Sequence, residues 1–208
     1  MTFEQAMAAL PLIAILRGVR PEEAEAVGGA LLDAGVTLIE VPLNSPEPFR
    51  SIEILATRLA GRAVVGAGTV LRAADTARIA AAGGSLCVMP HADPVVIAAA
   101  KEAGLVCLPG VATPTEAFAA LAAGADGLKL FPAEVLPPAV VKAWRAVLPK
   151  GTRLFPVGGI EPASMAGYVG AGASGFGLGS ALYKPGMEAG EVAGRARGFV
   201  AAWRALSG

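Results

Sequence analysis

Residues 121–132 read Leu-Ala-Ala-Gly-Ala-Asp-Gly-Leu-Lys-Leu-Phe-Pro, the end of an alanine-rich helix followed by a short apolar strand. Gly124 is predicted to end the helix, because glycine adopts the left-handed backbone conformation of a helix end without steric cost. The same order of alanine-rich segment, glycine and apolar run recurs at Gly35, Gly83, Gly104 and Gly172. The sequence is therefore a series of helix-to-strand units.

Eight apolar runs are predicted to be strands, and segments of helical length lie between them. The runs are residues 12–17, 38–43, 63–70, 86–90, 106–110, 127–132, 153–158 and 175–182. Several helices begin with proline near the first turn, and Thr113 with Glu116 forms a predicted capping box. This alternation predicts an α/β fold, a parallel (β/α)₈ TIM barrel forming one domain over residues 1–208, with a short leading helix within residues 1–10. The competing fold is an open doubly wound sheet, but residues 16–20 lack its glycine-rich dinucleotide fingerprint.

The composition is that of a packed domain with a small partner. The chain is 54% hydrophobic, and 17 basic residues balance 17 acidic ones, with no basic cluster to bind nucleic acid or an anionic membrane surface. Residues 162–183 carry no charge, but their glycines and serines interrupt any aliphatic run, so we expect no membrane span. Residues 1–10 lack the basic flank of a signal peptide. Cys87 and Cys107 lie in apolar runs and are expected to be reduced, buried thiols of a cytoplasmic protein.

Lys129 lies in the middle of the apolar run at residues 127–132. Side chains alternate along a strand, so Leu128 and Leu130 face one side while Lys129 faces the other. If both faces of the strand are covered, Lys129 is buried, and burial lowers the pKa of an amine toward the neutral form that attacks carbonyl groups. The alternative is a lysine at a sheet edge whose ammonium group reaches water.

Arg17, Glu40 and Thr69 lie at the carboxyl ends of the first three predicted strands, which is where a barrel carries its active site. Alternation places Glu40 on the inner face, and the second and sixth strands are opposite one another, so Glu40 and Lys129 are expected to share a cavity. The amine could form a Schiff base with a ketone, Glu40 could move protons, and Arg17 could hold an anionic end of the substrate. The alternative is a buried ion pair without catalysis.

Glycines lie at the ends of the last two predicted strands, as Gly158 with Gly159 and as Gly179 followed by Ser180. Backbone N–H groups at these positions of a barrel can approach a phosphate closely, which predicts a phosphorylated substrate. The only histidine, His91, follows the fourth strand and is expected to be a loop residue near the rim of the pocket. One histidine cannot form a multi-histidine metal site and no acidic cluster is present, so we expect neither a metal nor another cofactor.

Six segments together carry a resemblance to a known family. They are residues 11–18, 40–46, 66–71, 129–133, 157–159 and 177–180. Through them the chain resembles the class I 2-keto-3-deoxy-6-phosphosugar-acid aldolases over nearly its whole length. It resembles the galactonate branch more closely than the gluconate branch because of residues 42–45 and Val157, where the gluconate branch tends to have a threonine before the paired glycines. Met89-Pro90-His91 departs from the family pattern and leaves the contacts of the fourth strand open.

The resemblance implies a homotrimeric barrel that cleaves 2-dehydro-3-deoxy-6-phosphogalactonate to pyruvate and D-glyceraldehyde 3-phosphate without a metal. It implies that Lys129 forms the Schiff base and that Glu40 is the acid and base. By the same matching it implies that Arg17 and Thr69 bind the pyruvate carboxylate end and that Gly158, Gly159, Gly179 and Ser180 bind the phosphate. Val157 is expected to contact the substrate as well, with an apolar surface where a threonine could bond the C4 hydroxyl of the gluconate epimer. The alternatives are the gluconate epimer or both epimers as substrate, a sugar-phosphate isomerase or epimerase, and a non-catalytic phosphate-binding barrel.

Overall fold

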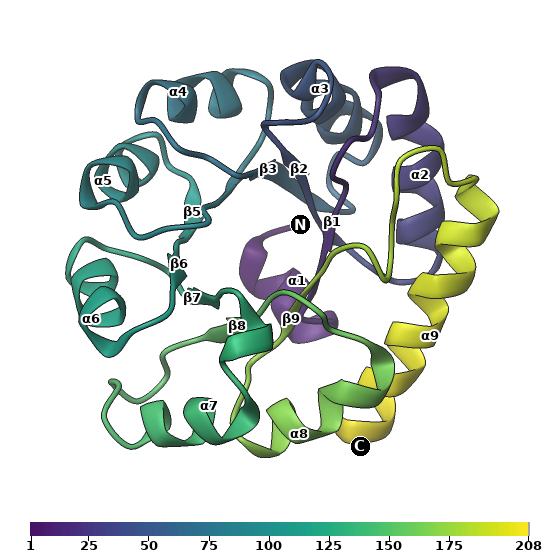
Figure 1. The fold of residues 1–208 in the computed structure, drawn as a ribbon. Helices are drawn as coiled ribbons and strands as arrows, with labels where there is room; N and C mark the ends of the chain where they lie inside the picture. Colours follow the sequence, from purple (N-terminus) through teal and green to yellow (C-terminus); the bar gives the residue numbers. More distant parts are fainter. Residues whose placement is uncertain (208) are drawn as a thin grey trace.

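A computed structural model describes residues 1–207 and has parallel strands surrounded by helices (Figure 1). The strands are β1 (Leu12–Ile15), β2 (Leu38–Pro42), β3 (Val64–Gly68), β4 (Leu86–Val88), β5 (Val106–Leu108), β6 (Gly110–Val111), β7 (Leu128–Leu130), β8 (Leu154–Pro156) and β9 (Phe176–Leu178). The helices are α1 (Phe3–Ala9), α2 (Pro21–Asp33), α3 (Pro48–Arg58), α4 (Ala74–Ala81), α5 (Pro94–Glu102), α6 (Pro114–Ala122), α7 (Pro138–Arg145), α8 (Met165–Gly170) and α9 (Ala189–Ser207), with 3₁₀ turns η1 (Ala133–Val135) and η2 (Pro162–Ser164). The predicted barrel and its leading helix are confirmed.

The strands close into a ring through parallel pairing. One sheet has the order β5-β4-β3-β2-β1-β9 and the other the order β6-β7-β8, and a bridge between Val157 and Gly177 joins β8 to β9. β5 and β6 flank Pro109 and together occupy the fifth of eight positions in the ring. The prediction of one continuous strand over residues 106–110 is wrong in this detail, because Pro109 has no N–H group to donate to a neighbouring strand.

The local sequence signals explain where the helices begin and end. Proline occupies the first turn of α2, α5 and α6, and the capping box predicted at Thr113 and Glu116 is formed. The predicted helix-ending glycines all have positive φ, at 95° for Gly35, 81° for Gly83, 72° for Gly104, 99° for Gly124 and 100° for Gly172. The connections are therefore short, and the strands take up their positions in the ring in sequence order.

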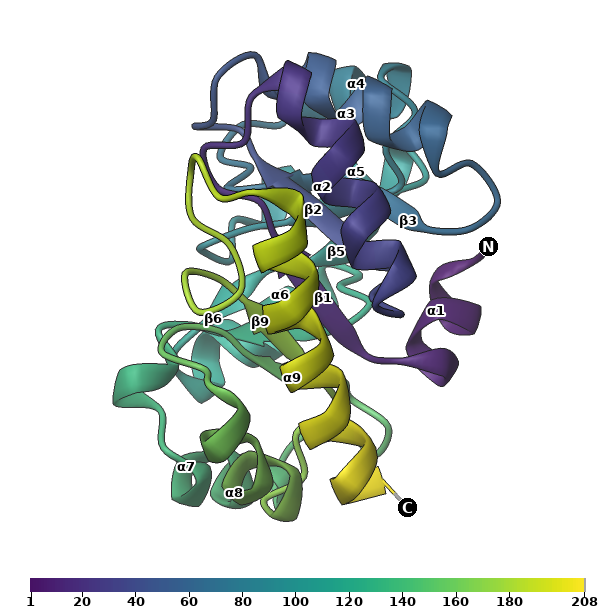
Figure 2. The same cartoon turned by 90° about the vertical axis from the view of Figure 1, so that its right-hand side faces the viewer.

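The apolar side chains form two layers, one between strands and helices and one inside the ring. The inner layer packs against Phe3 and Ala6 of α1 and consists of Ile13, Leu38, Val64, Leu86, Val88, Leu108 and Phe155. Figure 2 shows α1 at one end of the barrel and the segment that joins β9 to α9 at the other. Since α1 closes the amino-terminal end of the strands, a ligand has access from the carboxyl-terminal end.

Two further expectations concern the chain as a whole. Within the described residues, no helix is both long and apolar enough to cross a membrane. Cys87 and Cys107 are free and fully buried, and they lie opposite each other on β4 and β5. They pack as small apolar side chains, as the sequence predicts.

Candidate active site

Lys129 lies on β7 and faces the interior of the barrel. Its neighbours Leu128 and Leu130 pack in the layer between strands and helices, while Lys129 is 5% exposed. Its Nζ lies 4.7 Å from the centre of the Phe131 ring. Burial lowers the pKa of Lys129; the negative charge of Glu40 opposes this effect and the positive charge of Arg17 adds to it. The alternative of a lysine at a sheet edge is wrong, and the observed environment favours the free amine.

Glu40 lies on β2 and is 1% exposed. Gly68 on the neighbouring β3 leaves room for its carboxyl group, because a Cβ atom at position 68 would overlap Oε1 of Glu40. Burial raises the pKa of Glu40, and the positive charges of Lys129 and Arg17 oppose this effect. Oε2 of Glu40 has no hydrogen-bond partner in the described part of the chain. Burial therefore favours the protonated form of this carboxyl group more than in a solvent-exposed glutamate, and a carboxyl group with a raised pKa is a candidate for proton transfer.

Glu40 and Lys129 act on each other electrostatically, because each shifts the pKa of the other toward the charged form. Among residues 1–207, no ion pair joins the two groups. Burial is the largest cause of the shift in both cases and moves both groups toward their neutral forms. The arrangement therefore differs from the buried Lys–Glu ion pair that was the alternative.

Arg17 follows β1 and makes two side-chain contacts at the same end of the barrel. Its Nη1 donates to Oδ1 of Asn44 at 2.7 Å, and its Nη2 donates to Oγ1 of Thr69 at 3.4 Å. Thr69 follows β3 with a φ of 54°, an uncommon conformation for a residue other than glycine. Arg17 and Thr69 thus come together as predicted. Sequence reasoning did not single out Asn44, although its position just after β2 placed it at this end.

One cavity of about 810 Å³ opens at the carboxyl ends of the strands. Of the predicted site residues, it is lined by Arg17, Lys129, Val157, Gly158, Gly159, Gly179 and Ser180. Two predicted site residues are not in its lining: Glu40, which is buried, and Thr69, which contacts the lining residue Arg17. Lining side chains that sequence reasoning missed include Asn44, Glu134, Tyr183, Lys184 and Arg195. Neither Met89 nor His91 is among the lining residues, and the expectation that His91 is a loop residue near the rim stays a prediction.

The two glycine segments present backbone N–H groups at this cavity. Gly158 and Gly159 have φ angles of 113° and 60°, which other residues adopt only with strain. In the described chain, the N–H groups of Gly159, Gly179, Ser180 and Ala181 donate no hydrogen bond to a protein acceptor. Three of these four groups are consecutive, and consecutive free N–H groups form a concavity that binds anions. The cavity that Lys129 lines can therefore also hold an anionic group.

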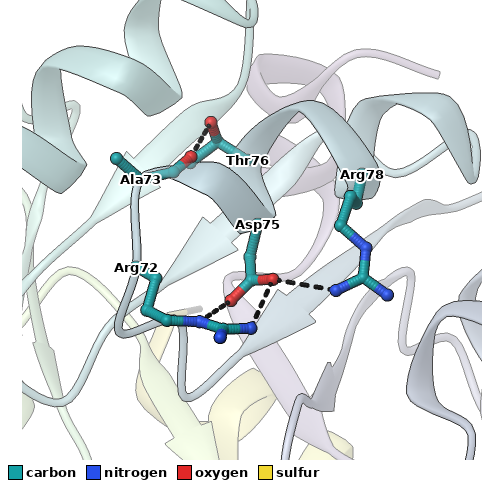
Figure 3. A network of polar contacts seen from close by, with 5 residues as sticks. All are labelled: Arg72, Ala73, Asp75, Thr76 and Arg78. Carbon is teal, nitrogen blue, oxygen red and sulfur yellow. Dashed lines mark hydrogen bonds and ion pairs between the residues drawn. The ribbon is translucent and has the colours of Figure 1, made fainter.

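A second, smaller cavity of about 450 Å³ lies outside the ring, next to α3 and α4. Its Asp75 is 5% exposed and accepts hydrogen bonds from Nε and Nη2 of Arg72 at 2.9 and 3.0 Å, and from Nη1 of Arg78 at 3.1 Å (Figure 3). The Arg78 guanidinium also lies 3.9 Å from the centre of the Phe49 ring. These two arginines already have partners, and none of the predicted site residues lines this cavity. This network stabilises the start of α4.

A parallel barrel with a buried lysine of lowered pKa beside a buried carboxyl group is the arrangement of a class I aldolase, in which an amine forms a Schiff base with a ketone. Comparison with known proteins agrees with this class. The profile of the KDPG and KHG aldolase family matches residues 3–195, and the chain belongs to this family.

Individual relatives are similar over almost their whole lengths. A probable 2-dehydro-3-deoxy-6-phosphogalactonate aldolase from Rhizobium meliloti (strain 1021) is 54% identical over 198 residues, covering 95% of this chain and 93% of the relative. The 2-dehydro-3-deoxy-6-phosphogalactonate aldolase from Escherichia coli (strain K12) is 45% identical over 195 residues, covering 94% and 95%. A solved native KDPGal structure superposes with a TM-score of 0.94 at 44% identity, covering 95% of this chain and 96% of that one. The resemblance inferred from the six segments is thus confirmed.

Proposed function

We propose that this chain cleaves 2-dehydro-3-deoxy-6-phosphogalactonate to pyruvate and D-glyceraldehyde 3-phosphate. The observation that carries the proposal is the buried Lys129, whose pKa is lowered by burial and which lines the same cavity as backbone N–H groups without a protein acceptor. The relatives with 54% and 45% identity support this choice of substrate by the reaction for which they are named.

The proposed reaction begins when the free amine of Lys129 attacks the C2 ketone of the substrate. Loss of the C2 oxygen as water leaves an iminium ion, which attracts electrons from the C3–C4 bond. That bond breaks as a proton leaves the C4 hydroxyl group, and the aldehyde is released. The remaining enamine takes up a proton at C3, and water then hydrolyses the imine to give pyruvate and the free amine.

Glu40 is proposed to move the protons in these steps. Its carboxyl group is buried and interacts electrostatically with Lys129, and its Oε2 has no protein partner within residues 1–207. Arg17 and Thr69 would hold the carboxylate at C1, since the guanidinium group supplies a fixed positive charge at that end of the cavity. The phosphate at the other end would accept hydrogen bonds from Gly158, Gly159, Gly179 and Ser180.

Val157 is proposed to favour the galactonate epimer. It lines the cavity directly before the paired glycines, and its Cγ atoms occupy the space beside Gly177. Val157→Thr keeps the shape of the side chain and adds a hydroxyl group that can bond the C4 hydroxyl of the gluconate epimer. One hydrogen bond changes binding by about 0.5–1.5 kcal/mol, so we expect the ratio of cleavage rates to shift toward gluconate by a few-fold to about tenfold.

The measurement for Val157 compares the cleavage rates of the two purified six-carbon substrates, because both epimers give the same products. The C4 configuration formed in the aldol direction is an independent check. A wild-type enzyme that prefers the gluconate epimer would show that the proposed substrate is wrong. A ratio that Val157→Thr leaves unchanged would exclude this role for Val157 alone.

Activity is expected to survive treatment with a chelator. The iminium ion formed on Lys129 accepts the electrons of the broken bond, so the proposed reaction uses no metal ion. The described residues contain no group of three or more histidine, cysteine, aspartate or glutamate side chains placed to hold a metal. Cleavage rates should be equal before and after dialysis against EDTA. A loss of activity that a divalent cation restores would indicate a metal-dependent aldolase instead.

Three further expectations stay predictions. They are the homotrimer implied by the family resemblance, the location in the cytoplasm, and the organisation of residues 1–208 as one domain.

A further inference from the structure

We infer that Lys184 and Arg195 make the cavity selective for phosphorylated substrates, Arg195 by positioning the backbone turn at residues 179–181 and Lys184 by its charge. This inference rests on the proposed function and extends it to two residues outside the barrel strands. Lys184 lies in the segment between β9 and α9, and Arg195 lies on α9. Both line the cavity that contains Lys129.

Arg195 holds the turn from its outer side. Its Nη1 donates to the carbonyl oxygens of Ala181 at 3.2 Å and of Ser180 at 3.5 Å. Its Nη2 donates to Oε1 of Glu191, one helical turn earlier on α9, at 2.9 Å. The rigid fork of a guanidinium group can make these contacts together, which an ammonium group cannot do with the same geometry. Arg195 therefore ties α9 to the turn.

The contact of Arg195 with the Ser180 carbonyl fixes the direction in which the Ala181 N–H group points. In a planar trans peptide the C=O and N–H bonds point in opposite directions. When Arg195 draws the Ser180 carbonyl to one side, the N–H group of Ala181, which belongs to the same peptide, points to the other. The N–H groups of Ser180 and Ala181 have no protein acceptor within the described chain, and Ser180 and Ala181 both line the cavity. Arg195 thereby orients the Ala181 N–H group toward an anion that Arg195 does not itself need to touch.

Lys184 supplies a positive charge near the same turn. It is exposed, and in the described part of the chain its ammonium group has no ion-pair partner. The cavity lining contains four cationic side chains, of which Arg17 and Lys129 belong to the reacting end, and two carboxylates, Glu134 and Glu161. Because Glu191 offsets part of the charge of Arg195, Lys184 is the cation at this end that is free to attract a phosphate dianion.

The test compares two aldehydes in the aldol direction with pyruvate as the donor. D-glyceraldehyde 3-phosphate carries the phosphate and D-glyceraldehyde does not, so the ratio of their kcat/KM values measures phosphate recognition. The variants are Lys184→Met, Lys184→Arg, Arg195→Met and Arg195→Lys. Lys142→Met is the matched control, because Lys142 is exposed on α7 and lies outside the cavity. Inhibition by inorganic phosphate provides a second measure that does not depend on the aldehyde.

Lys184→Met should lower kcat/KM for the phosphorylated aldehyde about tenfold or more, chiefly by raising KM, which corresponds to the loss of one charge-assisted hydrogen bond. Arg195→Met should lower it in the same direction, because the Ser180 carbonyl is released and the Ala181 N–H group is no longer held toward the phosphate. The kcat/KM for D-glyceraldehyde should change less than about threefold, because this aldehyde has no phosphate to lose a contact. Lys184→Arg should restore phosphate recognition. Arg195→Lys should restore it only in part, because it keeps the charge but loses the paired carbonyl contacts. The inhibition constant of inorganic phosphate should rise in parallel, and Lys142→Met should leave every value unchanged.

Equal losses with both aldehydes would show that Arg195 merely stabilises the fold, and unchanged kinetics in Lys184→Met would exclude a role for its charge. If Arg195→Met does not fold, Arg195→Lys and both Lys184 variants still decide the question. Reductive trapping with pyruvate separates this inference from the proposed function. A wild-type chain that forms no imine contradicts the proposed function, whereas normal trapping with unchanged phosphate selectivity in the variants contradicts only this inference.

Discussion

Lys129→Arg is expected to lose at least about 10⁴-fold in cleavage rate, because a guanidinium group stays protonated and does not attack a ketone. The wild-type amine is available because burial lowers the pKa of Lys129, which increases the fraction of free amine at neutral pH. The measurement is the initial rate of pyruvate formation from the six-carbon substrate.

Lys129→Met is the companion variant, because its side chain has a similar length and places no charge in the barrel interior. Thermal unfolding of both variants should show that the barrel is retained. Lys150→Arg, at an exposed position outside the cavity, should keep wild-type activity. A cleavage rate in Lys129→Arg close to that of the wild-type enzyme would rule out Lys129 as the nucleophile.

Glu40→Gln should lower the cleavage rate about 10²–10⁴-fold while some imine formation with pyruvate is retained. The amide has the size of the carboxyl group that Gly68 accommodates, so the interior of the barrel should keep its packing. It cannot take up and release protons, however, and proton transfer should become rate-limiting. The measurements are single-turnover cleavage and, separately, the yield of reductive trapping.

Gly68→Ala tests whether the position of the carboxyl group matters as well as its chemistry. A Cβ atom at position 68 would overlap Oε1 of Glu40, so this carboxyl group must move. We expect a slower enzyme in which Glu40 is still present.

For Glu40→Gln, a cleavage rate close to that of the wild-type enzyme would indicate that the carboxyl group is structural only.

Most of the fold can be predicted from the sequence because local signals agree with the tertiary structure. Alternation of side chains placed Glu40 and Lys129 inside the barrel, and each helix-ending glycine supplied the positive φ that its turn requires. The split of the fifth strand at Pro109 follows from a missing N–H group, but its effect depends on the neighbouring strands.

The rest of the site depends on contacts between distant segments, which sequence patterns do not encode. Arg17 and Asn44 lie 27 positions apart and meet because β1 and β2 are neighbours with a shared carboxyl end. Arg195 reaches the turn at residues 180–181 from the second turn of α9, in a helix that otherwise has an ordinary amphipathic sequence.

The most direct test of the account is mass spectrometry of the protein after incubation with pyruvate and borohydride. The proposed mechanism predicts one pyruvate-derived adduct per chain, located by peptide mapping on Lys129, since this lysine combines a lowered pKa with a place in the cavity lining. Lys184 lines the same cavity but is exposed, which makes it an internal control for non-specific reaction. An adduct found only on Lys184, Lys101, Lys142 or Lys150, or no adduct at all, would contradict the Schiff-base mechanism.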